Sequence, residues 1–423
     1  MTGRQSVAVI GAGVSGLTAA YLLRERYDVT LYEAEPRLGG HAHTHTVTDP
    51  DGAALAIDSG FIVHNRRTYP QLLKLFTALE VPTQASEMSM SVRVAQTGLE
   101  YAGGRGLAGI FAQPWRLLSP AYWRFLLEIK RFHRAGRALL TSTDDGDETT
   151  FGEFLTRQRF SYAFIRDFAV PFVACVWSTG TSSVLDYPAR YLMVFLQHHG
   201  LLQVGDSPRW RTVVGGSRTY VDAVAATLAD VRVGRAVTSV LRTPEGVTVL
   251  DSSNTEQRFD KVVLATHADQ ALTLLAAPTA AEKEVLGAFR YADNTATLHT
   301  DASLLPAARG ARACWNYLVP IERSGADPAP IVSYWMNRLH RLASRTNYLV
   351  TLNASDRIAP DTVIAEMQYR HPIYDLPAVA AQRRLASLTT AQITFAGAYH
   401  GWGFHEDGCR SGVAAARAFG ADW

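Results

Sequence analysis

The stretch from Ser6 to Glu33 reads SVAVIGAGVSGLTAAYLLRERYDVTLYE, and it predicts a complete βαβ unit. Ser6 to Ile10 is typical of a short buried strand in a parallel sheet. The glycines of GAGVSG follow at once, Leu17 to Arg24 predicts a helix, and Tyr27 to Tyr32 predicts a second strand. Glu33 then ends that strand roughly twenty residues after the glycines, as in dinucleotide-binding folds.

Each residue of the glycine turn has a physical task. Gly11 permits the tight turn, Gly13 lets the backbone approach a pyrophosphate, and Gly16 lets the helix pack closely on the strand. The helix N-terminus at Val14 and Ser15 offers free N–H groups and a positive dipole end to the phosphates. The alternative is a glycine-rich turn without a ligand, which the strand, helix and acid around it disfavour.

The residues after this unit favour FAD over NAD. Glu33 would accept hydrogen bonds from ribose hydroxyls, and an acid there disfavours the 2′-phosphate of NADP. The run Arg37-Leu38-Gly39-Gly40-His41 follows, and here the sequence resembles the superfamily of flavin-dependent amine oxidases and carotenoid desaturases. There, a Gly-Gly pair after the second strand passes close to FAD, and arginine usually follows the pair. The resemblance implies that FAD also lies near Ala34, Arg37 and His41, with the role of His41 open.

A C-terminal block, from Ile393 to Gly412, resembles the closing motif of the same superfamily. That motif is a strand, a loop across the isoalloxazine ring, and a helix whose N-terminus faces the flavin; we expect the helix at Val413 to Phe419. Relatives place an acid directly after the strand's glycine, but this chain has Ala398, so Glu406 or Asp407 would serve instead. The resemblance implies these cofactor contacts: Gly397, Gly403, Phe404, His405, Glu406, Asp407 and Ser411.

The middle of the chain supplies further strands of the same fold. Asp260 to Thr266 predicts a turn and a buried strand that returns to the sheet, with Ala265 and Thr266 beside the cofactor. Arg232–Val237 and Gly246–Val249 predict two more strands. In related proteins, the residue at the position of Val237 holds adenine through its backbone.

We therefore expect the α/β class: a Rossmann-like FAD-binding domain with an inserted α+β substrate domain, in the two-domain amine oxidase fold. The FAD-binding domain would comprise residues 1–65, 205–290 and 390–423, and the substrate domain residues 66–204 and 291–389. A chain of 423 residues is long enough for two such domains.

Composition narrows the class of protein. The hydrophobic fraction of 47% indicates a soluble globular protein, and a net charge of +2 implies no nucleic-acid partner. Three widely spaced cysteines form neither a disulfide framework nor a CxxC metal motif, which favours the cytoplasm. We expect no signal peptide and no membrane-spanning helix, because the apolar runs are short.

Residues 111–134 mix aromatic and basic side chains in a helical stretch. Such an amphipathic segment can lie on a membrane surface, which would make the protein peripheral at the inner membrane face. The alternative is a helix that packs on the core of the substrate domain, with its arginines solvated.

Asp58, His64 and His41 are the candidates for acid–base chemistry. Asp58 and His64 follow a predicted strand, Ala54 to Ile57, that leads to the flavin in the superfamily; alternatively, Asp58 caps a turn and His64 packs at a domain junction. His41, His43 and His45 alternate along the chain, but no carboxylate at ligand spacing accompanies them. We therefore expect no metal, and we expect His41 to line the flavin site.

The amine oxidase pattern itself is incomplete. Many amine oxidases carry a lysine near the flavin N5; Thr295 stands at roughly that position, and no lysine is near it. Phe404 matches one wall of the aromatic cage of these enzymes, although many of them have tyrosine there. Further candidate substrate contacts are Trp177, Tyr399 and Trp402.

Several strings, among them Asp58-Ser59-Gly60-Phe61-Ile62-Val63 and Cys175-Val176-Trp177-Ser178, resemble one branch of the superfamily. Its members are NAD/FAD-binding proteins described beside cyclopropane-fatty-acid synthases. The resemblance implies an FAD-dependent oxidoreductase that oxidises or desaturates a hydrophobic, fatty-acyl substrate by hydride transfer to the flavin N5. The alternatives are a flavin amine oxidase that produces hydrogen peroxide and a flavin-dependent isomerase without net redox change.

Overall fold

Five strands that lie far apart in the sequence form one parallel sheet, in the order β10-β2-β1-β14-β20. The structure is a computed structural model that describes residues 4–142, 148–203, 205, 207–321 and 330–423. The strands are β1 (Ser6–Ile10), β2 (Asp28–Tyr32), β10 (Asp230–Arg232), β14 (Lys261–Leu264) and β20 (Ile393–Phe395). The predicted α/β class is confirmed.

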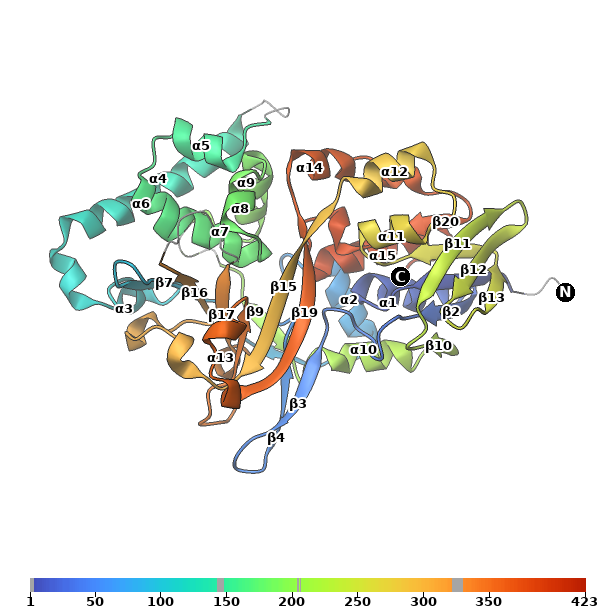
Figure 1. The fold of residues 1–423 in the computed structure, drawn as a ribbon, viewed down its shortest axis with the longest axis horizontal. Coiled ribbons are helices and arrows are strands. Elements are labelled where there is room, and N and C mark those ends of the chain that lie inside the picture. The colour runs from blue at the N-terminus through green and yellow to red at the C-terminus, as the bar shows by residue number, and fades with distance from the viewer. Residues whose placement is uncertain (1–3, 143–147, 204, 206, 322–329) are drawn as a thin grey trace.

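Side chains alternate along each strand and point to both faces of this sheet, and both faces are buried because other elements cover them. Val7 and Val9 join one hydrophobic core with α1 (Val14–Leu23), and Ala8 and Ile10 join another core on the opposite face. Figure 1 places these layers on the right. The first face also carries α2 (Pro70–Ala78), α10 (Arg218–Ala225) and α15 (His405–Ala418); the second carries β11 (Val237–Thr243), β12 (Gly246–Asp251), β13 (Glu256–Phe259), α11 (Ala268–Leu274), α12 (Ala280–Gly287) and α14 (Leu376–Gln382).

Helix α15 begins at His405, so the expected start at Val413 is wrong. The reason is the role of two glycines. A Cβ on Gly408 would lie 2.6 Å from Val14 Cγ1, and a Cβ on Gly412 would collide with Ser15 O. Both glycines therefore lie inside the helix, where they let α15 pack against α1.

A second sheet has seven strands, in the order β19-β15-β18-β17-β16-β7-β8. All neighbours are antiparallel except β16 and β7. Its long strands β15 and β19 stand in the middle of the molecule, between the parallel sheet and the helices on the left (Figure 1). The strands are β19 (Val363–Ile373), β15 (Arg290–His299), β18 (Leu349–Leu352), β17 (Ile331–Trp335), β16 (Trp315–Val319), β7 (Met90–Val94) and β8 (Leu99–Gly103).

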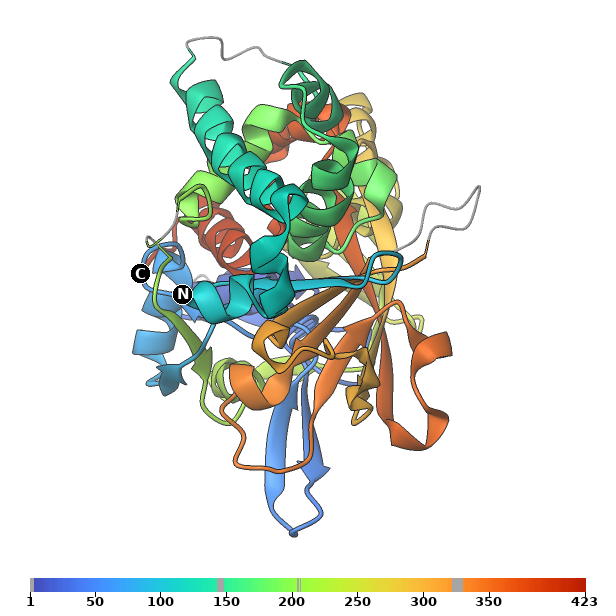
Figure 2. The ribbon, with the colours of Figure 1, turned by 90° about the vertical axis from the view of Figure 1, so that its left-hand side faces the viewer.

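The end of the molecule remote from the parallel sheet is helical (Figures 1 and 2). Its core is rich in aromatic side chains, including Phe132, Phe164, Trp177 and Phe195. Among the described residues, no helix is long and apolar enough to cross a membrane. The helices are α3 (Gly106–Ile110), η1 (Pro114–Leu118), α4 (Pro120–Thr141), α5 (Phe151–Arg157), α6 (Tyr162–Phe164), η2 (Ile165–Ala169), α7 (Val170–Trp177), α8 (Thr181–Leu185) and α9 (Ala189–His198).

Short elements connect these parts. β3 (Thr44–Thr48) and β4 (Ala54–Asp58) form a hairpin, and β5 (His64–Asn65), β9 (Trp210–Val213) and β6 (Thr83–Ala85) form a small sheet, with α13 (Met336–Leu339) as a further short helix. The expected strand Arg232–Val237 is wrong, because β10 ends and β11 begins at those residues and Gly234 turns the chain between them at a φ of 67°. The parallel strands fall within residues 1–65, 205–290 and 390–423, but the domain boundaries stay a prediction.

Candidate active site

The glycine turn after β1 is built by close backbone contacts. Gly11 has a φ of 99° and donates its N–H to Tyr32 O (2.8 Å). A Cβ on Gly11 would lie 2.7 Å from Ala265 O, and a Cβ on Gly16 would overlap Gly11 O. At these two positions any other residue would push α1 or β14 away, so the turn fits only glycine.

Gly13 differs from both, because a Cβ there would meet no atom of the protein within 4 Å. The first turn of α1 has no side-chain cap and no acidic residue. Its leading N–H groups, at Val14, Ser15 and Gly16, therefore have no acceptor within the helix and can bind an anion. The open space at Gly13 and these donors fit the pyrophosphate of a dinucleotide.

Glu33 and the glycine pair complete this end of the site. Glu33 accepts backbone N–H groups from Ala12 (2.8 Å) and Glu35 (2.9 Å), and each carboxylate oxygen keeps capacity for a ribose hydroxyl. Gly39 donates to Ala12 O at 2.9 Å, and a Cβ on Gly40 would lie 3.3 Å from Gly13 Cα. The pair therefore crosses directly beside the glycine turn.

Several other residues predicted to contact the cofactor lie at the same edge of the parallel sheet. Arg37 Nη1 donates to Gly40 O (2.8 Å), and Ala34 is exposed in the turn after β2. The chain between β10 and β11 joins this edge, since Arg235 donates its N–H to Glu33 O at 2.8 Å, and Val237 follows it. Ala265 and Thr266 follow β14 at the same edge, where Ala265 donates to Ile10 O (2.8 Å).

The two acids of the C-terminal block, Glu406 and Asp407, accept hydrogen bonds from backbone N–H groups of the protein. Glu406 accepts N–H groups from Gln71 and Leu72, both at 3.0 Å, and thereby caps α2. Asp407 accepts from the N–H groups of Trp402 (3.0 Å) and Phe404 (3.1 Å) and pairs with Arg410. Burial raises the pKa of Glu406 to about 7 and that of Asp407 to about 6.

Three other predicted cofactor contacts in this block also have structural partners. The Ser411 hydroxyl bridges Gly397 N–H (2.9 Å) and Gly408 O (2.7 Å), so its bonds hold the loop to the helix. The His405 ring stacks on Phe61 with ring centroids 3.7 Å apart, and its Nε2 contacts Tyr220 Oη at 2.8 Å. The side chains of Glu406, Asp407 and Ser411 thus already bind backbone groups of the protein, and their predicted direct contacts with the cofactor stay predictions.

A histidine cluster surrounds His41, directly after the glycine pair. His41 stacks on Tyr369 at 4.9 Å, and its ring lies 5.4 Å from His371 and 6.3 Å from His267. The buried His41 Nε2 has no hydrogen-bond partner. Burial, reinforced by the His371 ring, holds the pKa of His41 well below its usual value, and burial lowers the pKa values of His267 and His371 to about 4. The cluster is therefore neutral at pH 7.

A chain of amides fixes the tautomer of His371. The backbone N–H of Thr295 donates to Asn353 Oδ1 (3.1 Å), so the Asn353 Nδ2 group must donate to Asn294 Oδ1 (2.8 Å). Asn294 Nδ2 then faces His371 Nδ1 at 3.0 Å as a donor. His371 Nδ1 is thus the acceptor, and its Nε2 carries the proton.

Thr295 lies on the wrong side of β15 for its predicted role. Partners across antiparallel strands point to the same face. Thr295 pairs with Gln368, whereas Asn294 pairs with Tyr369 and so shares the face that stacks on His41. Thr295 therefore points away from the His41 cluster, and its predicted contact with the substrate stays a prediction that this register disfavours.

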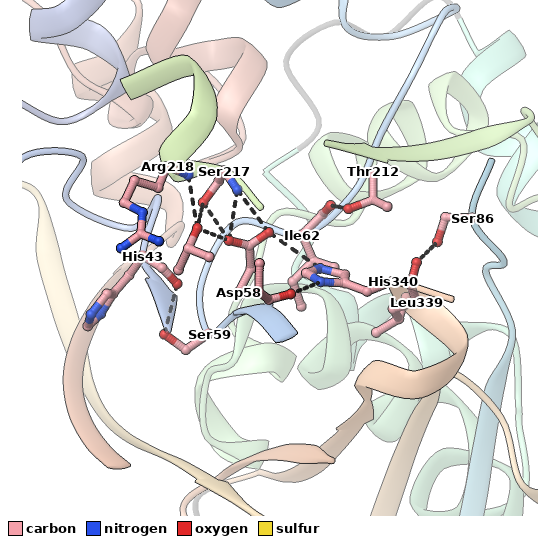
Figure 3. A network of polar contacts seen from close by, with 12 residues as sticks. His43, Asp58, Ser59, Ile62, Ser86, Thr212, Ser217, Arg218, Leu339 and His340 are labelled. Carbon is pink, nitrogen blue, oxygen red and sulfur yellow. Dashed lines mark hydrogen bonds and ion pairs between the residues drawn. The ribbon is translucent and has the colours of Figure 1, made fainter. Parts of the chain in front are cut away.

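Asp58 is an anchor of the hairpin rather than a free acid. It is 1% exposed and accepts the hydroxyls of Thr44 (2.6 Å) and Ser217 (2.7 Å) and the N–H of Ser217 (2.9 Å). His340 Nε2 stands 3.4 Å from its second oxygen. Figure 3 shows the carboxylate enclosed between Ser217 and His340. This network favours a positioning role.

His64 is buried without a polar partner. Both of its ring nitrogens lack hydrogen bonds, and the ring packs edge-on against Phe76 (5.3 Å) and Tyr69 (6.4 Å). Burial lowers the pKa of His64 to about 4. This arrangement favours the alternative in which His64 packs at a junction between elements.

Aromatic side chains form a wall that we call the aromatic wall: Trp177, Phe195, Trp402 and Phe404. Phe404 stacks on Phe195 at 5.0 Å and lies 6.2 Å from Trp177, whose indole N–H donates to Trp402 O (2.9 Å). Three predicted substrate contacts therefore meet. Tyr399 does not join them, because it packs with Phe289 (5.2 Å) in the core of the parallel sheet.

Tyr369, His371, Asn294 and His267 belong to the cluster around His41 but were not among the residues predicted for the site. Tyr369 and His371 alternate along β19, and that period of two marks one strand face. This signal was available, but which face meets His41 depends on the pairing of β19 with β15. Among the described residues, no group of three or more His, Cys, Asp or Glu side chains could hold a metal ion.

Comparisons with known proteins agree on the fold. The family model for "Flavin containing amine oxidoreductase" matches residues 14–299. A carotenoid phi-ring synthase of Streptomyces griseus is 43% identical over 65 residues, which is 15% of this chain and 13% of that protein. The matched stretch thus spans a small part of that relative.

Solved structures align over nearly the whole chain. Cyclohexylamine oxidase from Brevibacterium oxydans has a TM-score of 0.69 at 17% identity and covers 99% of both chains. A putrescine oxidase triple mutant has a TM-score of 0.71 at 17% identity, with 98% of both chains covered. A CLA-producing fatty acid isomerase from P. acnes has a TM-score of 0.67 at 16% identity, with 97% of this chain and 98% of that chain covered. The predicted amine oxidase-like two-domain fold is confirmed.

Proposed function

The chain belongs to the flavin containing amine oxidoreductase family, and we propose that it uses the FAD cofactor of that family to oxidise or desaturate a hydrophobic, fatty-acyl substrate. We also propose, from the resemblance of the strings at Asp58–Val63 and Cys175–Ser178, that it belongs to the branch found beside cyclopropane-fatty-acid synthases. The fatty acid isomerase among the similar folds is compatible with an acyl substrate.

The cofactor would be held mainly by backbone. We assign the pyrophosphate to the N–H groups at the start of α1, the ribose to Glu33, and the adenine edge to Val237. The Gly39–Gly40 pair and His41 would then border the flavin end. When bound, FAD supplies its N5 atom as the acceptor of a hydride from the substrate carbon.

One observation supports an uncharged substrate: the acidic side chains that were candidates for the site, Asp58, Glu406 and Asp407, already accept hydrogen bonds from the protein. Asp407 accepts two loop N–H groups, Glu406 caps α2, and Asp58 accepts hydrogen bonds from three donor groups. The histidines of the cluster are neutral. An ammonium group would therefore lose water without gaining an anionic partner, whereas an acyl chain would pack on Trp402 and Phe404.

Desaturation removes two hydrogens from adjacent carbons, one as hydride and one as a proton. We assign His41 Nε2, buried and unpartnered, as the acceptor of that proton. The Nε2–H of His371 serves as a fixed hydrogen-bond donor beside it. The aromatic wall excludes water from the reacting carbons.

The test is anaerobic reduction of the holoprotein, followed by the visible absorbance of the flavin. Oleate, linoleate and a diacyl phosphatidylglycerol are compared with cyclohexylamine and putrescine. Without oxygen, the bound flavin is the oxidant for one equivalent of substrate, so no second oxidant is needed. We expect the acyl compounds to bleach the flavin with formation of a carbon–carbon double bond. Bleaching by the amines alone would show an amine oxidase; a displaced double bond with oxidised flavin throughout would show an isomerase.

A further inference from the structure

One surface of the helical end carries large apolar side chains that are exposed to solvent. We call it the Leu118 patch: Leu107, Trp115, Leu117, Leu118, Trp123 and Leu127. Leu118 is 88% exposed, Leu107 74% and Trp115 64%. Their elements, α3, η1 and the first half of α4, face the viewer in Figure 2. A cluster of this kind on a water-exposed surface marks an interaction site.

Helix α4 explains why these residues are not needed for the core. Tyr122, Phe125 and Phe132 point from one side of the helix into the aromatic core. Trp123 and Leu127 lie one helical turn apart on the opposite side, and Lys130 and Arg134 continue that same side toward the C-terminus. The helix therefore has a buried face and a separate apolar and basic face.

The patch is held rigidly in place. Trp123 donates its indole N–H to Leu117 O (2.9 Å), and its ring packs 5.4 Å from Phe111. Ser119 caps α4 by accepting the N–H of Tyr122. Gln113 Nε2 donates to Gly98 O (2.7 Å), which ties the loop before η1 to the turn between β7 and β8. The apolar side chains are thus preorganised outward, so binding would cost little ordering.

Positive charge surrounds the patch. Residues 105–137 contain seven basic residues and one acid, Glu128, in a chain whose net charge is only +2. Glu128 is already bonded to the N–H (3.0 Å) and hydroxyl (2.6 Å) of Ser161. A second copy of the chain would bring the same positive rim against this one, because a two-fold interface pairs identical surfaces. An anionic surface with an apolar interior is complementary to both the exposed apolar side chains and the positive charge around them.

From these observations we infer that the Leu118 patch docks the protein on an anionic lipid bilayer. Trp115, Leu118 and Leu127 would enter the boundary between head groups and acyl chains, while Arg124, Lys130 and Arg134 contact the phosphates. The inference is independent of the substrate. It places α4, whose buried face shares its core with Trp177 and Phe195, between the bilayer and the aromatic wall.

The test is flotation of the holoprotein with two kinds of vesicle, pure phosphatidylcholine and a 7:3 mixture of phosphatidylcholine and phosphatidylglycerol. We expect binding to the anionic vesicles, at least tenfold weaker binding to the neutral ones, and a blue shift of tryptophan fluorescence on binding. L118D/L127D should lose at least tenfold in binding, and R124E/K130E/R134E should lose the preference for anionic lipid. Ile364→Asp and Arg345→Glu, at exposed positions elsewhere, are the matched controls.

All variants must keep their flavin and melting temperature, because the changed residues are exposed. Equal binding of the wild type and L118D/L127D to anionic vesicles would overturn the inference. So would a wild-type dimer, seen by light scattering, that L118D/L127D dissociates, because the patch would then serve a second copy of the chain. A protein that ignores both vesicle types overturns it as well.

Discussion

The glycine turn at Gly13 and the histidine cluster at His41 lie next to each other, but they are built in opposite ways. The turn uses backbone atoms from one continuous stretch, with Gly11 and Gly16 chosen because no Cβ fits. The cluster uses side chains from three remote segments, represented by His41, His267 and His371. A site built from the backbone of one segment depends on residue types at fixed spacing in the sequence. A site built from side chains of remote segments depends on how the sheets pack.

We expect the largest effect from substitutions within the glycine turn itself. Gly16→Ala should abolish the folded flavoprotein, because its Cβ would overlap Gly11 O and separate α1 from β1. Gly13→Ala should fold, since its Cβ meets no protein atom, but should bind FAD at least tenfold more weakly, a loss of about 1.4 kcal/mol. Flavin content and circular dichroism distinguish the two outcomes; a flavin-replete Gly16→Ala protein would refute this account of the turn.

Within the cluster, His41→Phe keeps a ring against Tyr369 and removes the unpartnered Nε2. We expect FAD to stay bound and the rate of anaerobic flavin reduction to fall about 10²-fold, as for loss of a general base. His43→Phe is the control, because His43 is half-buried and bonds to Tyr369 Oη from outside the cluster (3.2 Å). Equal rates for the two variants would remove His41 from the chemistry.

Asn353→Asp interrupts the amide chain that sets the tautomer of His371. Aspartate can still accept the Thr295 N–H, and it tolerates the φ of 57° at this position, but it cannot donate to Asn294. We expect about a tenfold slower flavin reduction and about 1–3 kcal/mol less stability. Asn337→Asp is the control: it likewise keeps the hydrogen bond from Tyr348 N–H and loses the one donated to Thr346 O, outside the amide chain of His371. It should cost stability and leave the rate unchanged.

The smallest effect concerns His64, which we expect to act through stability alone. Burial lowers its pKa to about 4, below the ordinary 6.5, so the unfolded chain binds more protons between these values. Its contribution to stability is present above pH 6.5 and is lost as the pH falls toward 4. His64→Phe should therefore gain up to about 2 kcal/mol over the wild type at pH 5, relative to pH 7.5. Melting curves at both pH values measure this, and a changed rate of flavin reduction would instead give His64 a direct role.

Local patterns predicted the parallel sheet well. The βαβ unit at Ser6–Glu33 was readable because alternation, glycines and the acid all lie within one short stretch. The start of α15 was not, because Gly408 and Gly412 resemble loop residues until α1 is packed against them. Likewise, Glu406 and Asp407 looked like free acids until α2 and the Trp402–Phe404 loop supplied their donors.

By itself, the sequence determined the dinucleotide fold, the place of the glycine turn and the acid after β2, because these depend on residue size and spacing along one segment. Only the tertiary structure decided which side chains face His41. A shift of one residue on β15 turns Thr295 away and brings Asn294 to the cluster, since neighbours on a strand point to opposite faces. The strand pairing that sets this register joins β15 to β19, whose partners lie about seventy residues along the chain, and no local pattern records it.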